Sequence, residues 1–193
     1  LLMPASRPQE LRYVLPTFMR AAKKLQQKYP SLIVFIPSCR SAFDEIFKKA
    51  FRKYQVKGLV ISQKDSAKLK PYIYSLTKIA FCKSGTVNME LALYGIPQIV
   101  GYRVSRVTAF IAKKILNFKV RFISPVNLLV NKLIIPEFVQ KEFDENKIFY
   151  KSCRIVEGKS EKIKIKKGYS FLKKELGEEG VVKRAAEEII NSI

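Results

Sequence analysis

The chain has 193 residues, of which 48% are hydrophobic and 27% charged, and this composition excludes collagen-like and disordered proteins. Its 37 lysines and arginines exceed its 16 acidic residues by 21, so the expected partner is anionic: a nucleic acid, an anionic membrane surface or a phosphorylated substrate. Histidine is absent, which excludes Ser-His-Asp and Cys-His nucleophile systems and histidine-based zinc sites within the chain.

Six short apolar runs predict β-strands in the first two thirds of the chain. They are rich in Ile, Val, Leu and Phe without clean alternation, which is typical of strands buried on both faces of a parallel sheet. The runs are 1–4, 32–37, 56–62, 78–82, Gln98–Tyr102 and 120–124.

Helical patterns lie between these runs, at 10–29, 42–54, 85–94 and 108–117. The third of them is followed by Gly95 and Pro97, a C-terminal glycine and a proline stop. Strand and helix alternate at intervals of about 20 to 25 residues, which predicts βαβ units. The expected fold class is therefore α/β, with a doubly wound, mostly parallel sheet of about six strands.

The pattern changes beyond Pro136. Residues 137–150 look helical, 155–166 form a charged, solvated stretch, and 168–176 and 178–190 predict two C-terminal helices. We expect a Rossmann-like domain over residues 1–150 and a helical extension over 151–193.

The cysteines and the chain ends also carry information. Cys39, Cys82 and Cys153 are far apart and odd in number, so they predict a reducing compartment rather than a disulfide framework or a CxxC metal site. No run of 18 apolar residues occurs. Since the chain starts without Met at a strand-like segment, we expect it to be a piece of a longer protein that lacks its N-terminal part.

Ligands of a doubly wound sheet bind outside the carboxyl ends of the strands, where the strand order reverses. In the common strand order, this point lies between the first and fourth strands. The loops concerned contain Ser6 and Arg7, and Ser84, Gly85 and Thr86. Arg7 can form a bidentate pair with phosphate. Ser84 or Gly85 is expected to cap the helix that follows, and Gly85 lets this helix start approach an anion closely. Each motif alone is more typical of a helix cap, but together at this point they favour a phosphate ligand.

Glu90 comes one helical turn after Thr86, so a carboxylate on that face could accept hydrogen bonds from ribose hydroxyls. A purely structural glutamate fits the spacing equally well. The dinucleotide fingerprint G-x-G-x-x-G is missing, which argues against NAD or FAD.

These segments, taken together, resemble the lipid-A-disaccharide synthase family. Residues 4–10 (PASRPQE) are similar to the family's P-G-S-R-x-x-E motif, with Ala5 in place of the usual glycine. The similarity continues through SGTVNME at 84–90, GIPQIVGYR at 95–103, PVNLL at 125–129 and PEFVQ at 136–140. It covers residues 1 to about 140, and the longer segment after Gln140 has no counterpart in the pattern.

The resemblance implies the C-terminal, nucleotide-sugar-binding half of a two-domain GT-B glycosyltransferase. The implied reaction joins UDP-2,3-diacylglucosamine to 2,3-diacylglucosamine 1-phosphate, giving lipid A disaccharide 1-phosphate and UDP, without a metal or other cofactor. The acceptor domain and the general base would lie in the N-terminal half, so this chain alone should be inactive. The implied location is peripheral, on the cytoplasmic face of the inner membrane. The oligomeric state stays open.

The implied UDP-binding residues come from five loops and helix starts. Arg103 is a further cation at the same rim, although a solvated surface arginine fits its position at least as well. Asn127 and Gln140 could hydrogen-bond a phosphate or sugar oxygen, although Val126 separates Asn127 from the proline that normally precedes it in the family. The full set is Ser6, Arg7, Glu10, Ser84, Gly85, Thr86, Glu90, Arg103, Asn127 and Gln140.

Two further features bear on partners. Residues 103–121 combine basic and apolar side chains, which suits either an interfacial segment for anionic lipid or an ordinary core helix with a lysine rim. The charge also fits a nucleic-acid-binding module, but no RRM, KH, zinc-finger or helix-turn-helix pattern occurs. Another UDP-sugar transferase or an epimerase of the same fold remains the other alternative.

Overall fold

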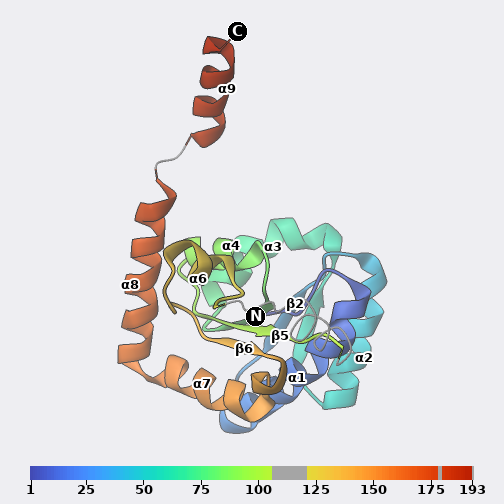
Figure 1. Ribbon diagram of the computed structural model, residues 1–193. Coiled ribbons are helices and arrows are strands. Elements are labelled where there is room, and N and C mark those ends of the chain that lie inside the picture. Colours follow the sequence, from blue (N-terminus) through green and yellow to red (C-terminus); the bar gives the residue numbers. More distant parts are fainter. Residues whose placement is uncertain (106–120, 178–179, 193) are drawn as a thin grey trace.

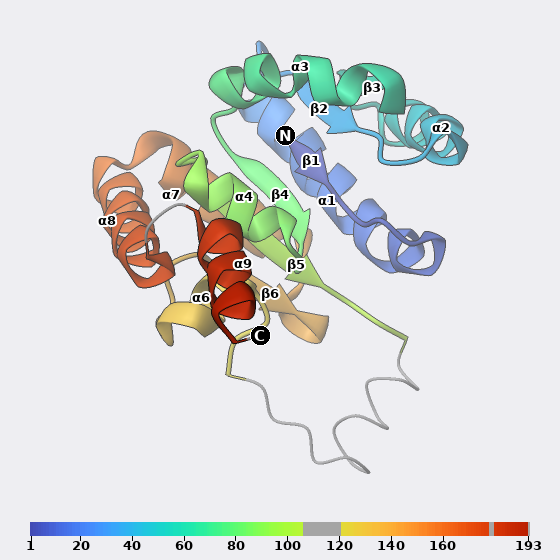
Figure 2. The ribbon, with the colours of Figure 1, turned by 90° about the horizontal axis from the view of Figure 1, so that it is seen from above.

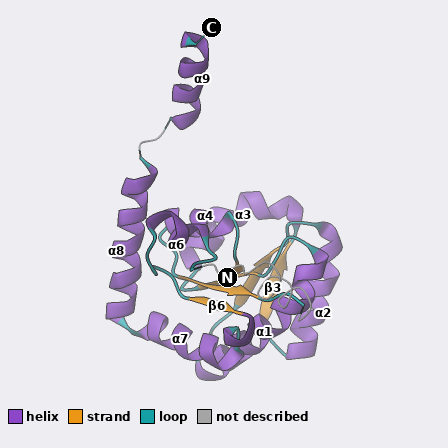
Figure 3. Ribbon diagram, in the orientation of Figure 1, coloured by secondary structure: helices purple, strands orange, loops and turns teal. Residues whose placement is uncertain are grey.

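The computed structural model describes residues 1–105, 121–177 and 180–192. It confirms the α/β class, with a mostly parallel sheet and helices on both faces (Figures 1 and 3). The strands are β1 (Leu2–Met3), β2 (Val34–Pro37), β3 (Gly58–Ile61), β4 (Ala80–Lys83), β5 (Gln98–Tyr102) and β6 (Glu137–Val139). The α-helices are α1 (Pro8–Lys28), α2 (Asp44–Tyr54), α3 (Gln63–Leu76), α4 (Val87–Leu93), α6 (Pro125–Val130), α7 (Glu145–Glu157), α8 (Lys159–Leu176) and α9 (Val181–Asn191). Two 3-10 turns complete the described elements, η1 (Ser41–Phe43) and η3 (Gln140–Glu142).

All strand pairs of the described chain are parallel. One sheet has the order β1-β4-β5-β6, and β2 pairs with β3 in a second sheet that meets the first where β2 contacts β1. The chain thus proceeds in one direction from β1 through β2 to β3, then returns to the other side of β1 with β4. The strand order reverses between β1 and β4, as the sequence predicts.

Helix α1 is the long helix beneath the sheet, and its sequence explains both its limits and its packing. It begins at Pro8, a residue suited to the first helical position, and ends at Lys28, with Tyr29 as its C-cap just before Pro30. Its buried stripe packs against α7 and α2 on one side of the sheet, whereas α4, α6 and α8 pack together on the other (Figures 1 and 2).

An aromatic cluster at the centre of the molecule joins α1 to the sheet. Phe18 of α1 stacks on Phe81 of β4 at 5.5 Å between ring centroids, and Phe143 meets Phe18 edge-on at 5.0 Å. A Cβ atom on Gly101 would lie 2.1 Å from the Phe143 ring. A glycine is therefore required on β5 at this point, because any side chain would displace the ring that fills the space.

The strand prediction is wrong at one place, the run 120–124. Its described part, 121–124, is irregular, and Glu137–Val139 instead supplies the strand beside β5. The backbone N–H groups of Ile123 and Ser124 donate to the carboxylate of Glu137, so they do not enter a strand ladder. Ser124 then caps α6, accepting from the Asn127 N–H at 3.2 Å.

Several helix predictions also need correction. The helix expected at 137–150 is instead β6, η3 and the start of α7, and the solvated stretch at 155–166 is helical. Helix α3 was not predicted, and its interior Pro71 weakens the helical pattern. The C-terminal glycine after α4 is confirmed, since Gly95 has φ +71°. The helix expected at 108–117, with most of the basic segment 103–121, lies outside the described residues.

Helices α7 and α8 continue the main body beyond residue 150. That position falls inside α7, and Ile155, Ile165, Tyr169 and Leu172 are buried in the common core. Helix α9 stands apart from the sheet in Figure 1, with Ile189 and Ile190 exposed.

Candidate functional site

The two predicted phosphate loops lie side by side at the carboxyl edge of the sheet. In the β1–β4 pair Met3 is opposite Cys82, so the loops that follow these two strands leave the sheet at the same level. Ser6 and Arg7 are exposed in the first loop, and Arg7 is the extended residue just before α1. Thr86 is exposed in the second loop, immediately before α4. The structure therefore brings Ser6, Arg7 and Thr86 to one edge, as expected.

An ion pair links the two loops. Nζ of Lys83, the last residue of β4, lies 2.7 Å from Oε1 of Glu10 in the first turn of α1. Each side chain is only 20% exposed. The Lys83 ammonium also lies 5.4 Å from the centroid of the Tyr102 ring at the end of β5. Lys83 was not among the predicted site residues, although it directly follows the predicted strand 78–82 and is the first residue of the loop that contains Ser84.

The second loop is held from within by Asn88. Its Oδ1 accepts from the Gly85 N–H at 2.9 Å, and its Nδ2 donates to the Lys83 carbonyl at 3.3 Å. The Ser84 hydroxyl donates to the Ile123 carbonyl. The expectation that Ser84 or Gly85 caps α4 is therefore wrong: Thr86 occupies the cap position, and the Gly85 N–H is already satisfied within the chain.

Asn88 belongs to a buried polar network that reaches α8. Its Nδ2 also donates to Oε1 of Gln98 at 3.1 Å. In return, Nε2 of Gln98 donates to the backbone carbonyl of Asn88 at 2.9 Å and to the Tyr169 hydroxyl at 3.1 Å. The Tyr169 hydroxyl donates to the Ile96 carbonyl at 2.9 Å. Burial raises the pKa of Tyr169 and raises the pKa of the Cys82 thiol to about 12, so both groups stay protonated at neutral pH.

Glu90 lies one turn along α4, but it already has a cationic partner. Lys70 of α3 forms an ion pair with its carboxylate, and both side chains are partly exposed. The neighbouring Tyr74 hydroxyl is buried, and burial together with the Glu90 charge raises its pKa. The Glu90 carboxylate is therefore partly exposed and paired with Lys70.

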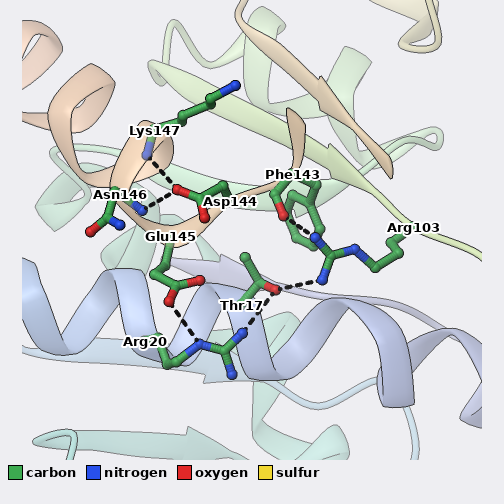
Figure 4. A network of polar contacts seen from close by, with 8 residues as sticks. All are labelled: Thr17, Arg20, Arg103, Phe143, Asp144, Glu145, Asn146 and Lys147. Carbon is green, nitrogen blue, oxygen red and sulfur yellow. Dashed lines mark hydrogen bonds and ion pairs between the residues drawn. The ribbon is translucent and has the colours of Figure 1, made fainter. Parts of the chain in front are cut away.

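Arg103 is engaged with the protein rather than free in solvent (Figure 4). Its guanidinium donates to the carbonyls of Gln140 and Phe143 and to the Thr17 hydroxyl, and it lies 5.2 Å from the Phe143 ring centroid. Thr17 also accepts from Arg20, which pairs with Glu145 at 3.3 Å. Arg103 thus fastens the end of β5 to α1 and to the turn before α7.

Gln140 and Asn127 have clear structural roles. Gln140 has φ +53° where β6 turns into η3, and its carbonyl accepts from Arg103. Asn127 is fully buried; its amide donates to the Ile135 carbonyl and Glu137, and its Oδ1 accepts two N–H groups. The structure therefore does not bring Asn127 to the exposed edge, because its hydrogen-bonding capacity is used inside the protein.

Glu137 is a further residue that the sequence analysis missed. Its carboxylate accepts from the backbone N–H groups of Ile123 and Ser124, the Ser124 hydroxyl and the Asn127 amide. Since Ile123 in turn accepts from Ser84, this carboxylate indirectly supports the second phosphate loop.

The described residues contain neither a cluster of metal ligands nor a membrane-spanning helix. No group of three or more His, Cys, Asp or Glu side chains is placed to hold a metal ion. No helix in the same part of the chain is long and apolar enough to cross a bilayer.

Comparison with known proteins settles the family. The profile described as lipid-A-disaccharide synthetase matches residues 1–192. The chain belongs to this family. It is 44% identical over 191 residues to the lipid-A-disaccharide synthase of Prochlorococcus marinus (strain MIT 9313), covering 99% of the chain and 49% of that protein.

Other lipid-A-disaccharide synthases are similar over the same extent. The chain is 36% identical to that of Gloeothece citriformis (strain PCC 7424) over 192 residues, 100% of the chain and 49% of the relative. It is 30% identical to that of Myxococcus xanthus (strain DK1622) over 189 residues, 98% of the chain and 48% of the relative. The chain thus spans about half the length of these relatives. The match extends through residue 192, so the expectation that the segment after Gln140 has no counterpart in the family is wrong.

Replacing Asn88 by Ala should loosen the second loop locally. The change leaves the Gly85 N–H without its acceptor and removes the Asn88 donor from Oε1 of Gln98, so we expect a loss of stability of about 1–3 kcal/mol in urea denaturation. Cys82 should then react faster with a thiol reagent, whereas in the native protein the exposed Cys39 reacts first.

Asn127→Ala is the matched control, since it also removes a buried, fully bonded amide but lies outside the Cys82 network. Equal acceleration of Cys82 labelling in both variants would show that global unfolding, not the local network, protects the thiol.

Proposed function

We propose that this chain supplies the UDP-sugar-binding half of a glycosyltransferase of lipid A biosynthesis. The reaction joins UDP-2,3-diacylglucosamine to 2,3-diacylglucosamine 1-phosphate and yields lipid A disaccharide 1-phosphate and UDP. The observation that carries the proposal is the juxtaposition of the Ser6–Arg7 loop and the Thr86 helix start at the β1–β4 reversal, in a chain of this family.

The chemistry of transfer explains why cations and hydroxyls should gather there. As the sugar leaves, negative charge grows on the UDP diphosphate, and groups that meet this charge stabilise the transition state. The exposed Arg7 guanidinium can bind two phosphate oxygens at once, and the Thr86 hydroxyl adds a donor on the opposite loop. In the same proposal Glu90 accepts from the ribose, while Ser6, Glu10, Ser84 and Gly85 shape the two loops.

The remaining candidates enter the proposal differently. Arg103 and Gln140 contact each other at the ends of β5 and β6, so they act on the donor by fixing this rim. Asn127 acts from the interior, by holding the segment between Ser124 and Ile135.

Arg7→Ala tests the assignment of the donor site. Loss of a charged hydrogen bond to phosphate should weaken UDP binding by about 1.5–3 kcal/mol in calorimetry. Arg52→Ala is the control, because Arg52 is an exposed arginine in the last turn of α2, at the other end of that helix from the carboxyl edge. Equal UDP affinity in the wild type and Arg7→Ala would contradict the assignment.

Glu90→Gln tests the ribose contact. The amide accepts less well than the carboxylate, so binding of UDP should weaken and the preference for UDP over 2′-deoxy-UDP should shrink. Lys70→Met breaks the ion pair but keeps the carboxylate, and it should preserve that preference. A Glu90→Gln protein with full discrimination would assign Glu90 a structural role alone.

The general base and the acceptor site are proposed to lie outside this chain. The acceptor oxygen must be held about 3–3.5 Å from the donor carbon, and a positioned base must take its proton. The chain has no histidine for this task, and in this proposal Glu10 and Glu90 serve the nucleotide site. We therefore expect the 193-residue chain to bind UDP but to transfer no sugar in a radiolabelled-donor assay, and a longer form with an N-terminal half to be active. Disaccharide formed at a similar rate by both would refute this division.

The proposed location is peripheral, on the cytoplasmic face of the inner membrane. The net charge of +21 favours an anionic membrane surface, and so does α8. This helix combines seven lysines with exposed Ile163, Phe171 and Leu176, as in helices that bind at a lipid interface. The protein should sediment with vesicles containing an anionic lipid and not with neutral ones, and lose binding as salt is raised.

Charge reversal identifies the surface. Lys166→Glu with Lys167→Glu should weaken vesicle binding, whereas Lys48→Glu with Lys49→Glu on α2 should do so less, although each pair of exposed lysines changes the net charge equally. The same loss from both pairs would rule out a specific role for α8.

A further inference from the structure

Lys83 occupies a distinctive position at the candidate donor site. It ends β4, opposite Gly101 of β5, and directly precedes the Ser84–Thr86 loop. Its ammonium lies 2.7 Å from Glu10 of α1 and 5.4 Å from the Tyr102 ring centroid, so it stands between the first turn of α1 and the end of β5.

Glu10 creates an electrostatic problem that Lys83 solves. Its carboxylate lies in the first turn of α1, three residues after Arg7. It is therefore next to the loop that is proposed to receive a diphosphate. A carboxylate so placed repels phosphate, and its low exposure reduces the screening by water. Its Oε2 atom is buried and has no hydrogen-bond partner among the described residues, whereas its Oε1 atom forms the ion pair with Lys83.

The ammonium also keeps hydrogen-bonding capacity. A lysine has three N–H donors, and the Glu10 contact uses one of them while the Tyr102 ring covers another side. A donor therefore remains for an anion at the adjoining loop.

We propose that Lys83 is a phosphate-binding cation of this edge, which neutralises Glu10 and offers its remaining N–H to the diphosphate of the bound nucleotide. The inference rests on the proposed UDP site. It assigns Glu10 an indirect role, in which the carboxylate fixes the lysine rather than contacting the nucleotide.

The experiment compares UDP with uridine as ligands, because only UDP carries the diphosphate. Calorimetry on the 193-residue chain would measure both for the wild type, Lys83→Met, and Lys83→Met combined with Glu10→Gln. Lys78→Met is the matched control: it removes the same charge from an exposed lysine just before β4, at the amino end of the strand.

Lys83→Met should weaken UDP binding at least about tenfold, equivalent to roughly 1.4 kcal/mol, and leave uridine binding within about twofold. Adding Glu10→Gln should recover part of the UDP affinity, because it removes the unpaired carboxylate, but not all of it. The double variant also serves if the single variant folds poorly, since it contains no unpaired buried charge. Lys78→Met should match the wild type.

Other outcomes would overturn the inference in distinct ways. UDP affinity unchanged by Lys83→Met, or an equal loss for uridine, would reduce Lys83 to a structural residue. No recovery in the double variant would refute the neutralisation of Glu10. A wild-type chain that binds no UDP would instead contradict the proposed function itself, and the inference with it.

Discussion

The parallel pairing of β1 with β4 is the constraint on which the candidate site depends. It joins strands whose positions in the sequence differ by almost eighty residues, and it sets both of their carboxyl ends at one level. The two following helices then begin at the same edge, where helix starts favour anions. The Glu10–Lys83 ion pair joins the helix after β1 to the end of β4, so it forms only when these two strands are neighbours.

The main architecture follows from the sequence because it is encoded locally. Uninterrupted apolar runs mark β2 to β5, and the proline and glycine signals mark the ends of α1 and α4. The strand prediction for residues 120–124 is wrong because the carboxylate of Glu137, distant in sequence, accepts hydrogen bonds from N–H groups that a strand would use. No local pattern shows such a contact, so the position of β6 could not be predicted in the same way.

The candidate site was likewise predictable where local sequence suffices and not where distant contacts decide. The fold rule located both loops, because it needs only the strand order and the loop sequences. It could not show that the amide of Asn127 is fully used by buried partners, or that the Arg103 guanidinium binds two backbone carbonyls. A residue's free hydrogen-bonding capacity is a property of its three-dimensional neighbours, and this is also why Lys83 was overlooked.

The hydroxyl of Tyr169 ties the length of the chain to the integrity of the second loop. It satisfies the Ile96 carbonyl and the Gln98 amide, and Gln98 in turn holds Asn88. A protein shortened at residue 150 would end within α7, remove the donor to the Ile96 carbonyl and take away one acceptor of the Gln98 amide. Any trimmed form intended for crystallisation or ligand screening therefore needs α8 at least through Leu172, even though α8 lies beyond the last strand of the sheet.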